Sequence, residues 1–220
     1  NAHSPYLSMI DFKPAPRAGE KIPLDGHHSH DFVPFQGGRR ALISSSVTDA
    51  AVVLDLKTLR PMKVLANEPE RQWFLHPDAV AVSEANSHAY ITSWRGGFVT
   101  VIDLRALKPI KRIDVSPGPS GAVISRDGQT LYVSHTVVRF NPESRVSEGV
   151  VTVIDTKTNR VVRKIPNVGK ESADVKLVPG SDIAVTANFR GQSISMISTS
   201  GQEKLSNIAL ATLTVGVGVV

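Results

Sequence analysis

The sequence predicts an all-β fold, a β-propeller built from four-stranded antiparallel blades. The first observation is a strand-like phrase, VTVID, which stands at Val99–Asp103 and again at Val151–Asp155. With looser copies, the phrase ends at Asp11, Asp55, Asp103, Asp155 and Ser198. The second observation is this spacing, because a period of roughly 40–50 residues of strand-like sequence is typical of propeller blades. The third is the order of elements, which repeats from copy to copy.

The clearest copy shows the order of elements within one blade. An inner strand at Ala122–Ser125 leads into a tight turn at Arg126–Gln129, whose Asp-Gly pair suits a left-handed backbone position. A second strand follows at Thr130–Ser134 and a third at Val150–Asp155. The outer strand, Arg160–Ile165, is basic and alternates weakly, as expected for an exposed edge. A β-sandwich with chance similarity between strands is the competing interpretation, and the fixed order of elements disfavours it.

Setting the copies in register divides the chain into about four full blades with partial blades at both ends. The expected ranges are 1–26 for the outer strands of a partial blade, 27–70, 71–115, 116–167 and 168–208 for the full blades, and 209–220 for an edge strand and the start of a missing blade. Propellers of this type usually have seven or eight blades. We therefore expect either a piece of a larger propeller, which is the preferred interpretation, or a split fifth blade made from the two ends.

Composition excludes several classes of protein and site. The chain has 220 residues, 41% of them hydrophobic, which is enough for a sizeable core. It has no run of about 18 apolar residues, so no membrane span is expected. It has no cysteine, which excludes disulfides, thiolate metal sites and covalently attached c-type haem within this chain. The net charge of +5 favours an anionic partner, but the basic residues form no long run, so nucleic acid is disfavoured.

Three segments together resemble the YVTN-type repeat. They are the turn SRDG at Ser125–Gly128, the strand LYVS at Leu131–Ser134 and the strand VTVID at Val151–Asp155. The resemblance covers nearly the whole chain and implies a β-propeller. Such repeats occur mainly in secreted, periplasmic and surface proteins, so the resemblance also implies export. On that basis Asn1 is interpreted as a start left by removal of a signal peptide.

One segment is also similar to a redox propeller. The sequence FNPESRVS at Phe140–Ser147, followed by VVTVID at Val150–Asp155, resembles a stretch of the d1-haem domain of cytochrome cd1 nitrite reductase. The resemblance implies a place in a periplasmic redox system. As the alternative function it implies an oxidoreductase acting on nitrogen compounds, with haem or copper held at the propeller face.

Loops that enter the inner strands and loops between second and third strands lie at one end of a propeller, so their side chains share a face. Five of the seven histidines fall in these loops: His27, His28, His30, His76 and His135. Imidazole is a common ligand of copper, zinc and haem iron. His30 and His76 are expected at equivalent positions of successive blades, with His135 on the next. These three are the candidate metal ligands, and ordinary solvated loop histidines are the alternative.

The same face carries candidate binding residues for a small anionic or planar ligand. They are Trp94, Arg95, Arg139, Arg145, Phe189 and Arg190. Arginine binds carboxylate or phosphate in a bidentate manner, and an aromatic ring can stack on a planar ligand beside it. The repeated aromatic-Arg-Gly sequence at 94–96 and 189–191 has a second interpretation, a turn in which Gly supplies the positive φ.

The long loop Thr136–Gly149 breaks the repeat, and loops longer than their siblings are often functional. It fits a docking element for a protein partner. The leading functional interpretation is therefore an exported propeller, periplasmic or secreted, that binds a ligand or protein partner through its His- and Arg-rich face within a larger complex or longer polypeptide. Asp55, Asp103 and Asp155 recur with the repeat and are expected to cap turns.

Overall fold

The computed structural model describes residues 4–13, 15–136 and 148–210 of the chain. These residues form eighteen β-strands, sixteen of which belong to four antiparallel sheets of four strands each. We call these sheets blades 1 to 4 in chain order. They confirm the all-β propeller class that the sequence predicts. Among the described residues, no helix is long and apolar enough to cross a membrane.

Within each blade the strands pair in chain order, so every connection joins neighbours. Blade 1 contains β3 (Phe32–Phe35), β4 (Arg40–Ser45), β5 (Ala50–Asp55) and β6 (Arg60–Leu65). Blade 2 contains β7 (Pro77–Ser83), β8 (His88–Ser93), β9 (Phe98–Asp103) and β10 (Lys108–Asp114). Blade 3 contains β11 (Pro119–Ile124), β12 (Thr130–His135), β13 (Glu148–Asp155) and β14 (Arg160–Lys170). Blade 4 contains β15 (Ser172–Leu177), β16 (Ile183–Asn188), β17 (Ser193–Ser198) and β18 (Glu203–Ala209).

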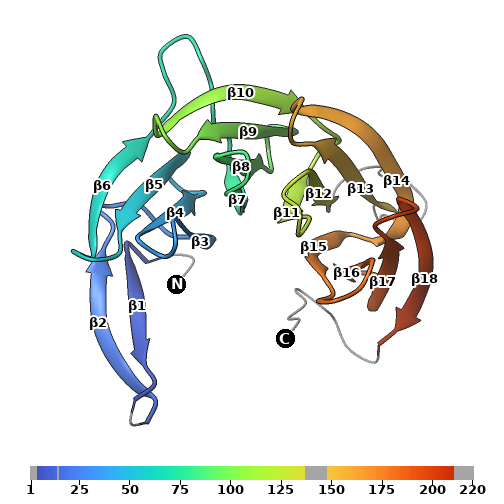
Figure 1. The fold of residues 1–220 in the computed structure, drawn as a ribbon, viewed down its shortest axis with the longest axis horizontal. Coiled ribbons are helices and arrows are strands. Elements are labelled where there is room, and N and C mark those ends of the chain that lie inside the picture. Colours follow the sequence, from blue (N-terminus) through green and yellow to red (C-terminus); the bar gives the residue numbers. More distant parts are fainter. Residues whose placement is uncertain (1–3, 14, 137–147, 211–220) are drawn as a thin grey trace.

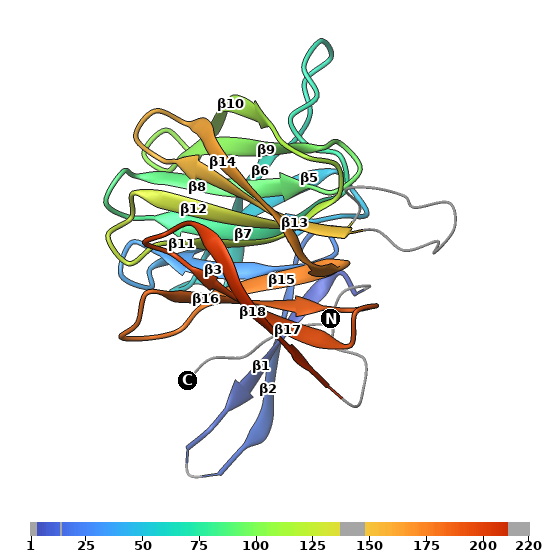
Figure 2. The same ribbon diagram turned by 90° about the vertical axis from the view of Figure 1, so that its right-hand side faces the viewer.

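The blades fan out along an arc, with the inner strands β3, β7, β11 and β15 toward its centre (Figure 1). The outer strands β6, β10, β14 and β18 form the convex rim. A two-stranded sheet of β1 (Tyr6–Asp11) and β2 (Arg17–Pro23) continues the arc beside blade 1. The blades are twisted, so β18 crosses β15 obliquely in the side view (Figure 2). Neighbouring inner strands contact one another, which gathers the starts of these strands around the centre.

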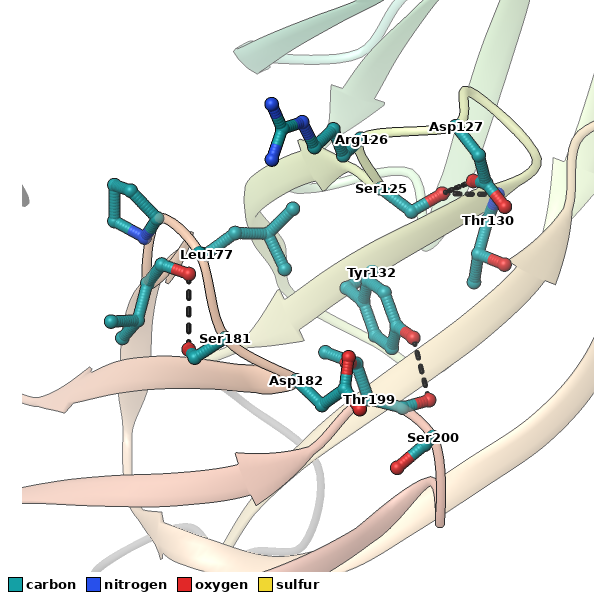
Figure 3. Close-up of a pocket in the computed structure, with 13 residues that line it drawn as sticks. Ser125, Arg126, Asp127, Thr130, Tyr132, Leu177, Ser181, Asp182, Thr199 and Ser200 are labelled. Carbon is teal, nitrogen blue, oxygen red and sulfur yellow. Dashed lines mark hydrogen bonds between the residues drawn. The ribbon is translucent and has the colours of Figure 1, made fainter.

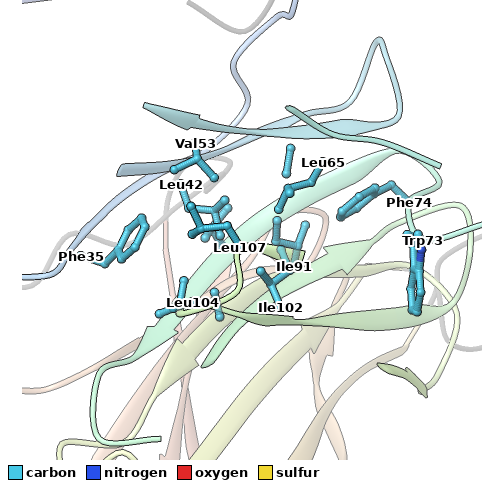
Figure 4. Close-up of a cluster of buried hydrophobic side chains, with 13 residues drawn as sticks. Phe35, Leu42, Val53, Leu65, Trp73, Phe74, Ile91, Ile102, Leu104 and Leu107 are labelled. Carbon is cyan, nitrogen blue, oxygen red and sulfur yellow. The ribbon is translucent and has the colours of Figure 1, made fainter. Parts of the chain in front are cut away.

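The hydrophobic core consists of separate layers, each between two neighbouring sheets. Successive side chains of a strand point to opposite faces of its sheet, so one strand serves two layers. In β5, for example, Val53 packs toward blade 2 with Leu42 and Ile91, whereas Val52 packs toward β2 with Ile22. Figure 4 shows the layer between blades 1 and 2. Because both faces are covered, β5 and β9 are almost continuously buried, while the outer strands remain mostly exposed.

The recurring aspartates cap turns, as the sequence predicts. An oxygen of Asp55 accepts the N–H groups of Lys57 and Thr58, and Asp103 accepts those of Arg105 and Ala106 in the same way. Asp155 repeats the contact with the N–H of Thr158. The backbone hydrogen bonds lower the pKa of each of the three carboxyl groups, since they favour the charged form. These aspartates therefore belong to the fold rather than to a reacting site.

Tyr90 links blade 2 to blade 3 through a buried hydroxyl group. The hydroxyl donates to Asn159 Oδ1 at 2.8 Å and lies 3.2 Å from the carbonyl oxygen of Thr156. Burial raises the pKa of Tyr90 above its usual value of 10.0, so the group stays a neutral donor. The next blade junction has a simpler version, in which the Tyr132 hydroxyl donates only to the carbonyl oxygen of Thr199 at 3.2 Å.

Replacing Tyr90 with phenylalanine is expected to lower the free energy of unfolding by about 1 kcal/mol, because a buried bridge between blades is lost. Urea denaturation of the wild type and the variant measures this difference. The matched substitution Tyr132→Phe removes a single, longer hydrogen bond and should cost less. Equal losses in the two variants would show that the bond to Asn159 contributes nothing.

The inserted loop of blade 3 returns to the sheet at Glu148, which pairs with Lys170. This pairing extends β14 to Lys170, beyond the expected start of the next blade at residue 168. Residues 137–147, which include most of the predicted docking loop Thr136–Gly149 and the segment similar to cytochrome cd1, lie outside the described part of the chain. Residues 211–220, most of the expected start of a missing blade, lie outside it as well.

Candidate functional site

In blades 1 to 3 the start of the inner strand is held by the same hydrogen bond, from a backbone N–H to a side-chain hydroxyl. The N–H of Asp31 donates to Ser44 Oγ, that of Ala79 to Thr92 Oγ1, and that of Gly121 to Ser134 Oγ. Ser44, Thr92 and Ser134 are each the penultimate residue of a second strand, so these contacts align the blades. His30 is therefore equivalent to Asp78 and Ser120. The expectation that His30 and His76 occupy equivalent positions is wrong by two residues.

The equivalent positions of all four blades line one cavity, which we call the axial pocket. It has a volume of about 220 Å³. Its walls are His30 and Asp31 before β3, Asp78 and Ala79 of β7, Ser120 of β11, and Ala173, Asp174 and Lys176 of β15. Sequence analysis places most of these residues in the strand-entry loops but singles out only His30. Sequence analysis missed Lys176, because a lysine on an inner strand is recognised as a pocket residue only once the blades are arranged around a centre.

An ion pair between two blades forms one wall of the axial pocket. His30 Nδ1 lies 2.7 Å from Asp78 Oδ1, and the side chain of Asp78 is only 16% exposed. The hydrogen bond to Asp78 raises the pKa of His30 above its usual value of 6.5, with further support from the charges of Asp78 and Asp31, although burial opposes the shift. The contact with Asp78 thus favours the charged form of the imidazole.

Asp31 and Ser44 hold this ion pair in place. Asp31 Oδ2 accepts the N–H of Val80 in the next blade at 2.8 Å, while Oδ1 accepts the N–H of Phe32. The Ser44 hydroxyl donates to the carbonyl oxygen of Asp78. Blades 1 and 2 are therefore joined by three side-chain contacts within a few residues of the pocket, and the wall is arranged before any ligand arrives.

The opposite wall of the axial pocket comes from blades 3 and 4. Lys176 Nζ lies 3.2 Å from Asp174 Oδ1 in a partly exposed ion pair. The hydroxyl group of Ser120 donates to the carbonyl oxygen of Ser172 at 3.3 Å, which ties the two blades together. The pocket thus combines carboxylates, an ammonium, an imidazole and a hydroxyl, which is a set suited to a small polar ligand.

Replacing Asp78 with asparagine is expected to lower the pKa of His30, since the largest cause of its elevation is removed while burial remains. Because the folded pKa is raised, the ion pair stabilises the wild type fully below about pH 6.5, and this stabilisation is lost as the pH rises through the folded pKa. Proton NMR titration of the His30 ring measures the shift. Asp182→Asn, at an exposed carboxylate far from the pocket, should leave the titration of His30 unchanged; an unaltered titration in Asp78→Asn would contradict the assignment.

The loops that enter the inner strands lie at the end of the propeller that holds the axial pocket, and we call this end the blade-entry face. His76 and Trp94 also lie there, and we call this pair of rings the aromatic shelf. Their ring centroids lie 5.3 Å apart at 54°. His76 has a φ of 55°, an uncommon value for a residue before proline, and its N–H donates to Asp49 Oδ1 of blade 1 at 2.5 Å. Trp94 Nε1 donates to Thr136 Oγ1 at 2.7 Å. Among the described residues, the buried Nδ1 of His76 has no hydrogen-bond partner.

The candidate arginines differ in their surroundings. Arg95 follows the aromatic shelf and is exposed, whereas the Nε of Arg190 lies 3.2 Å from Glu171 Oε1 in an ion pair. Phe189 is partly buried, and its N–H donates to the carbonyl oxygen of Glu171. The structure thus places both aromatic-Arg-Gly sequences in turns after second strands, in separate blades. Arg139 and Arg145 lie outside the described residues.

His135 is a fully buried residue at the end of β12. Its Nε2 lies 2.9 Å from Thr152 Oγ1, and its Nδ1 lies 3.2 Å from the carbonyl oxygen of Pro117. Burial lowers the pKa of His135 to about 4, so the imidazole is neutral at physiological pH. Both ring nitrogens are engaged within blade 3. The equivalent residue of blade 4, Asn188, is likewise buried and hydrogen-bonded. The side chain at this position therefore forms internal hydrogen bonds in both blades.

The structure does not bring the three candidate metal ligands together. His30 pairs with Asp78, His76 packs on Trp94, and His135 is enclosed by its own blade. Among the residues that the structure describes, no group of three or more His, Cys, Asp or Glu side chains could hold a metal ion. A metal role for His30 or His76 stays a prediction.

A larger hollow lies at the other end of the strands, between blades 3 and 4. Its volume is about 840 Å³, and Tyr132 lies at its back, with the turns before β12 and β16 on either side (Figure 3). At the junction of blades 2 and 3 the Asn86 side chain bridges to Gly128 and Thr156. Gly128 occupies the corresponding turn of blade 3 and has no side chain to do the same. None of the predicted site residues lines this hollow.

The four blades and the pocket at their inner strands define the class of protein: a β-propeller, described here over four full blades. No family model matches the chain. It is 29% identical over 114 residues to the uncharacterized protein YncE of Salmonella typhi, and equally to that of Salmonella typhimurium; each match covers 50% of this chain and 30% of the relative. Its fold is similar to that of Kuenenia stuttgartiensis hydrazine synthase, with a TM-score of 0.68 and 23% identity over 83% of this chain and 51% of that one.

Proposed function

We propose that this chain is part of an exported propeller that binds a ligand or protein partner through its blade-entry face, within a redox system. The observation that carries the proposal is the axial pocket, to which all four blades contribute charged or polar side chains. A cavity lined by convergent polar groups from several elements is the ordinary form of a binding site. The aromatic shelf and Arg95 extend the same face outward.

Two features of the axial pocket favour binding over covalent chemistry. Each of its carboxylates already has a partner: Asp31 accepts backbone N–H groups, Asp78 pairs with His30, and Asp174 pairs with Lys176. A polar ligand can replace one partner of such a pair and is then oriented by the group that it contacts. None of these pairs forms the nucleophile and base arrangement of acyl or phosphoryl transfer. The place in a redox system rests on the sequence resemblance to the d1-haem domain.

The second candidate function is an oxidoreductase with haem or copper at this face. It is favoured by the likeness of fold to a hydrazine synthase, an enzyme named for forming a nitrogen compound. His76 is the histidine best placed for such a role. Its ring packs against Trp94, its backbone N–H is held by Asp49, and its Nδ1 lacks a hydrogen-bond partner among the described residues. His135 does not fit, since both of its ring nitrogens are engaged.

Two measurements on the full-length protein from its native host test these functions. Visible absorption and metal analysis separate them first, since a chromophore or stoichiometric metal that is lost in His76→Ala would favour the oxidoreductase. Affinity purification then compares the wild type with Trp94→Ala/Arg95→Ala and with a control, Arg126→Ala/Lys157→Ala, at exposed turns of the other end. The proposal expects the face variant alone to lose its bound partner or ligand. Equal recovery from both variants would reject the blade-entry face as the binding surface.

A further inference from the structure

Positive charge is concentrated on the outer strands of the propeller. The five outer strands β2, β6, β10, β14 and β18 carry twelve Lys or Arg residues against three acidic ones. The remaining strands carry two basic residues, Arg40 and Lys176, against seven acidic ones. Basic residues thus predominate on the strands of the convex rim, and acidic residues predominate on the remaining strands. We call the exposed outer faces of β6, β10 and β14 the basic rim.

The cations of the basic rim have no acidic partners within the described chain. The ion pairs found there are Asp11 with Arg17, Asp78 with His30, Asp174 with Lys176 and Glu171 with Arg190, and none involves β6, β10, β14 or β18. Lys111 and Arg112 donate to backbone carbonyl oxygens, which leaves their charge uncompensated. Uncompensated charges of one sign along a surface produce a field that attracts an oppositely charged partner.

Each outer strand of the rim also exposes an apolar side chain beside a basic one. Met62 precedes Lys63, Ile110 precedes Lys111, and Val162 precedes Arg163; the three apolar side chains are 43%, 40% and 55% exposed. A surface of alternating basic and apolar groups suits a polypeptide partner, because carboxylates of the partner can pair with the basic groups and its apolar side chains can pack on the apolar ones. A phosphate backbone offers nothing to the apolar groups. A flat membrane touches a convex arc at one or two blades, whereas the basic rim extends over three successive blades.

We infer that the basic rim is a docking surface for an acidic polypeptide that follows the curve of the outer strands. This surface is separate from the axial pocket and the aromatic shelf, so the inference does not depend on the proposed function. Part of the charge has a simpler use, since lysines on edge strands discourage pairing with other chains. Edge protection requires charge on each strand, but it does not require the near absence of acidic residues along the entire rim.

Binding to poly-L-glutamate tests the inference with a defined acidic polypeptide. In the full chain, Lys63→Gln/Arg163→Gln/Lys164→Gln neutralises three rim charges, and Lys57→Gln/Arg126→Gln/Lys157→Gln removes the same charge from turns at the other end. The rim variant should bind poly-L-glutamate about tenfold more weakly and the control within about twofold of the wild type, with affinity falling as salt rises. Circular dichroism and thermal melting confirm that both variants are folded.

Three results would overturn the inference. Equal weakening in the two variants would mean that net charge alone drives binding. Tighter binding to a duplex DNA of matched charge, or to phosphatidylserine vesicles, would assign the rim to nucleic acid or to a membrane instead. Self-association of the rim variant with unchanged affinity for poly-L-glutamate would show that the charges protect the strand edges only.

Discussion

Replacing His135 with alanine is expected to lower the free energy of unfolding by about 3 kcal/mol. The substitution leaves a cavity in blade 3 and removes the hydrogen-bond partner of both the Thr152 hydroxyl and the Pro117 carbonyl. The Thr152 hydroxyl lies where water has little access, since His135 and Thr152 are fully buried, whereas Pro117 is exposed. Urea denaturation at pH 7.5 measures the loss. His27→Ala, at a partly exposed histidine with one hydrogen bond to Thr48, is the control and should cost less than about 1 kcal/mol.

The pH dependence of this loss separates a buried neutral histidine from a general packing defect. The pKa of His135 is lowered to about 4 in the folded protein, against 6.5 as its ordinary value. The unfolded chain therefore binds the proton first, and the wild type loses about 3 kcal/mol of stability as the pH falls from 6.5 toward 4. His135→Ala lacks this loss, so the difference between the proteins should shrink over that interval. A difference that stays constant would show that folding does not lower the pKa of His135.

Two of the three candidate metal ligands, His30 and His135, affect the stability of the fold in opposite senses. His30 stabilises the fold in its charged form, because its imidazolium faces Asp78, and it loses that effect as the pH rises. His135 stabilises the fold in its neutral form and loses that effect as the pH falls. The two effects are lost on opposite sides of about pH 6.5, that of His135 as the pH falls toward 4 and that of His30 as the pH rises through its raised pKa. Asp78→Asn and His135→Ala separate the two contributions.

The repeating elements could be predicted from the sequence because they depend on local pattern. The alternation of apolar side chains, the Asp-Gly turn and the capping aspartates act within a few residues, so each copy reports the same strand and turn. The axial pocket depends on a different kind of contact. The sequence aligns His30 with His76, but the hydroxyl groups of Ser44 and Thr92 align Asp31 with Ala79, and therefore His30 with Asp78. That shift is what brings His30 against Asp78.

His135 is a second residue whose surroundings could not be predicted from the sequence. Its place after a strand and before a long loop suggests an exposed residue on the working face. The strand continues through His135, however, and Thr152 of the third strand supplies a partner that the second strand alone does not reveal. The surroundings of residues at strand ends are thus the least predictable part of the site. When a strand extends by one more residue, the side chain of that residue moves from solvent into the sheet.

Gly121, at the junction of blades 3 and 4, is expected to tolerate little change. A Cβ atom placed on Gly121 would lie 2.5 Å from Ser134 Oγ, 2.8 Å from Asp174 Cα and 2.9 Å from the backbone N of Val175. The hydroxyl can rotate away, but the two backbone atoms belong to β15 of the next blade and move only with that strand. Gly121→Ala should therefore lower the free energy of unfolding by about 3 kcal/mol, as measured by urea denaturation.

The neighbouring substitution Ser120→Ala is the matched control, because it alters the same strand without adding bulk at the junction. It removes the 3.3 Å hydrogen bond to the carbonyl oxygen of Ser172 and should cost no more than about 1 kcal/mol. Because the clash involves Asp174, Gly121→Ala should also increase hydrogen exchange in β15 while leaving β7 protected, so the displaced strand is identified directly. Losses of similar size in the two variants, or uniform exchange across both strands, would mean that blades 3 and 4 adjust freely. The axial pocket would then lack the rigid wall that its proposed role in binding requires.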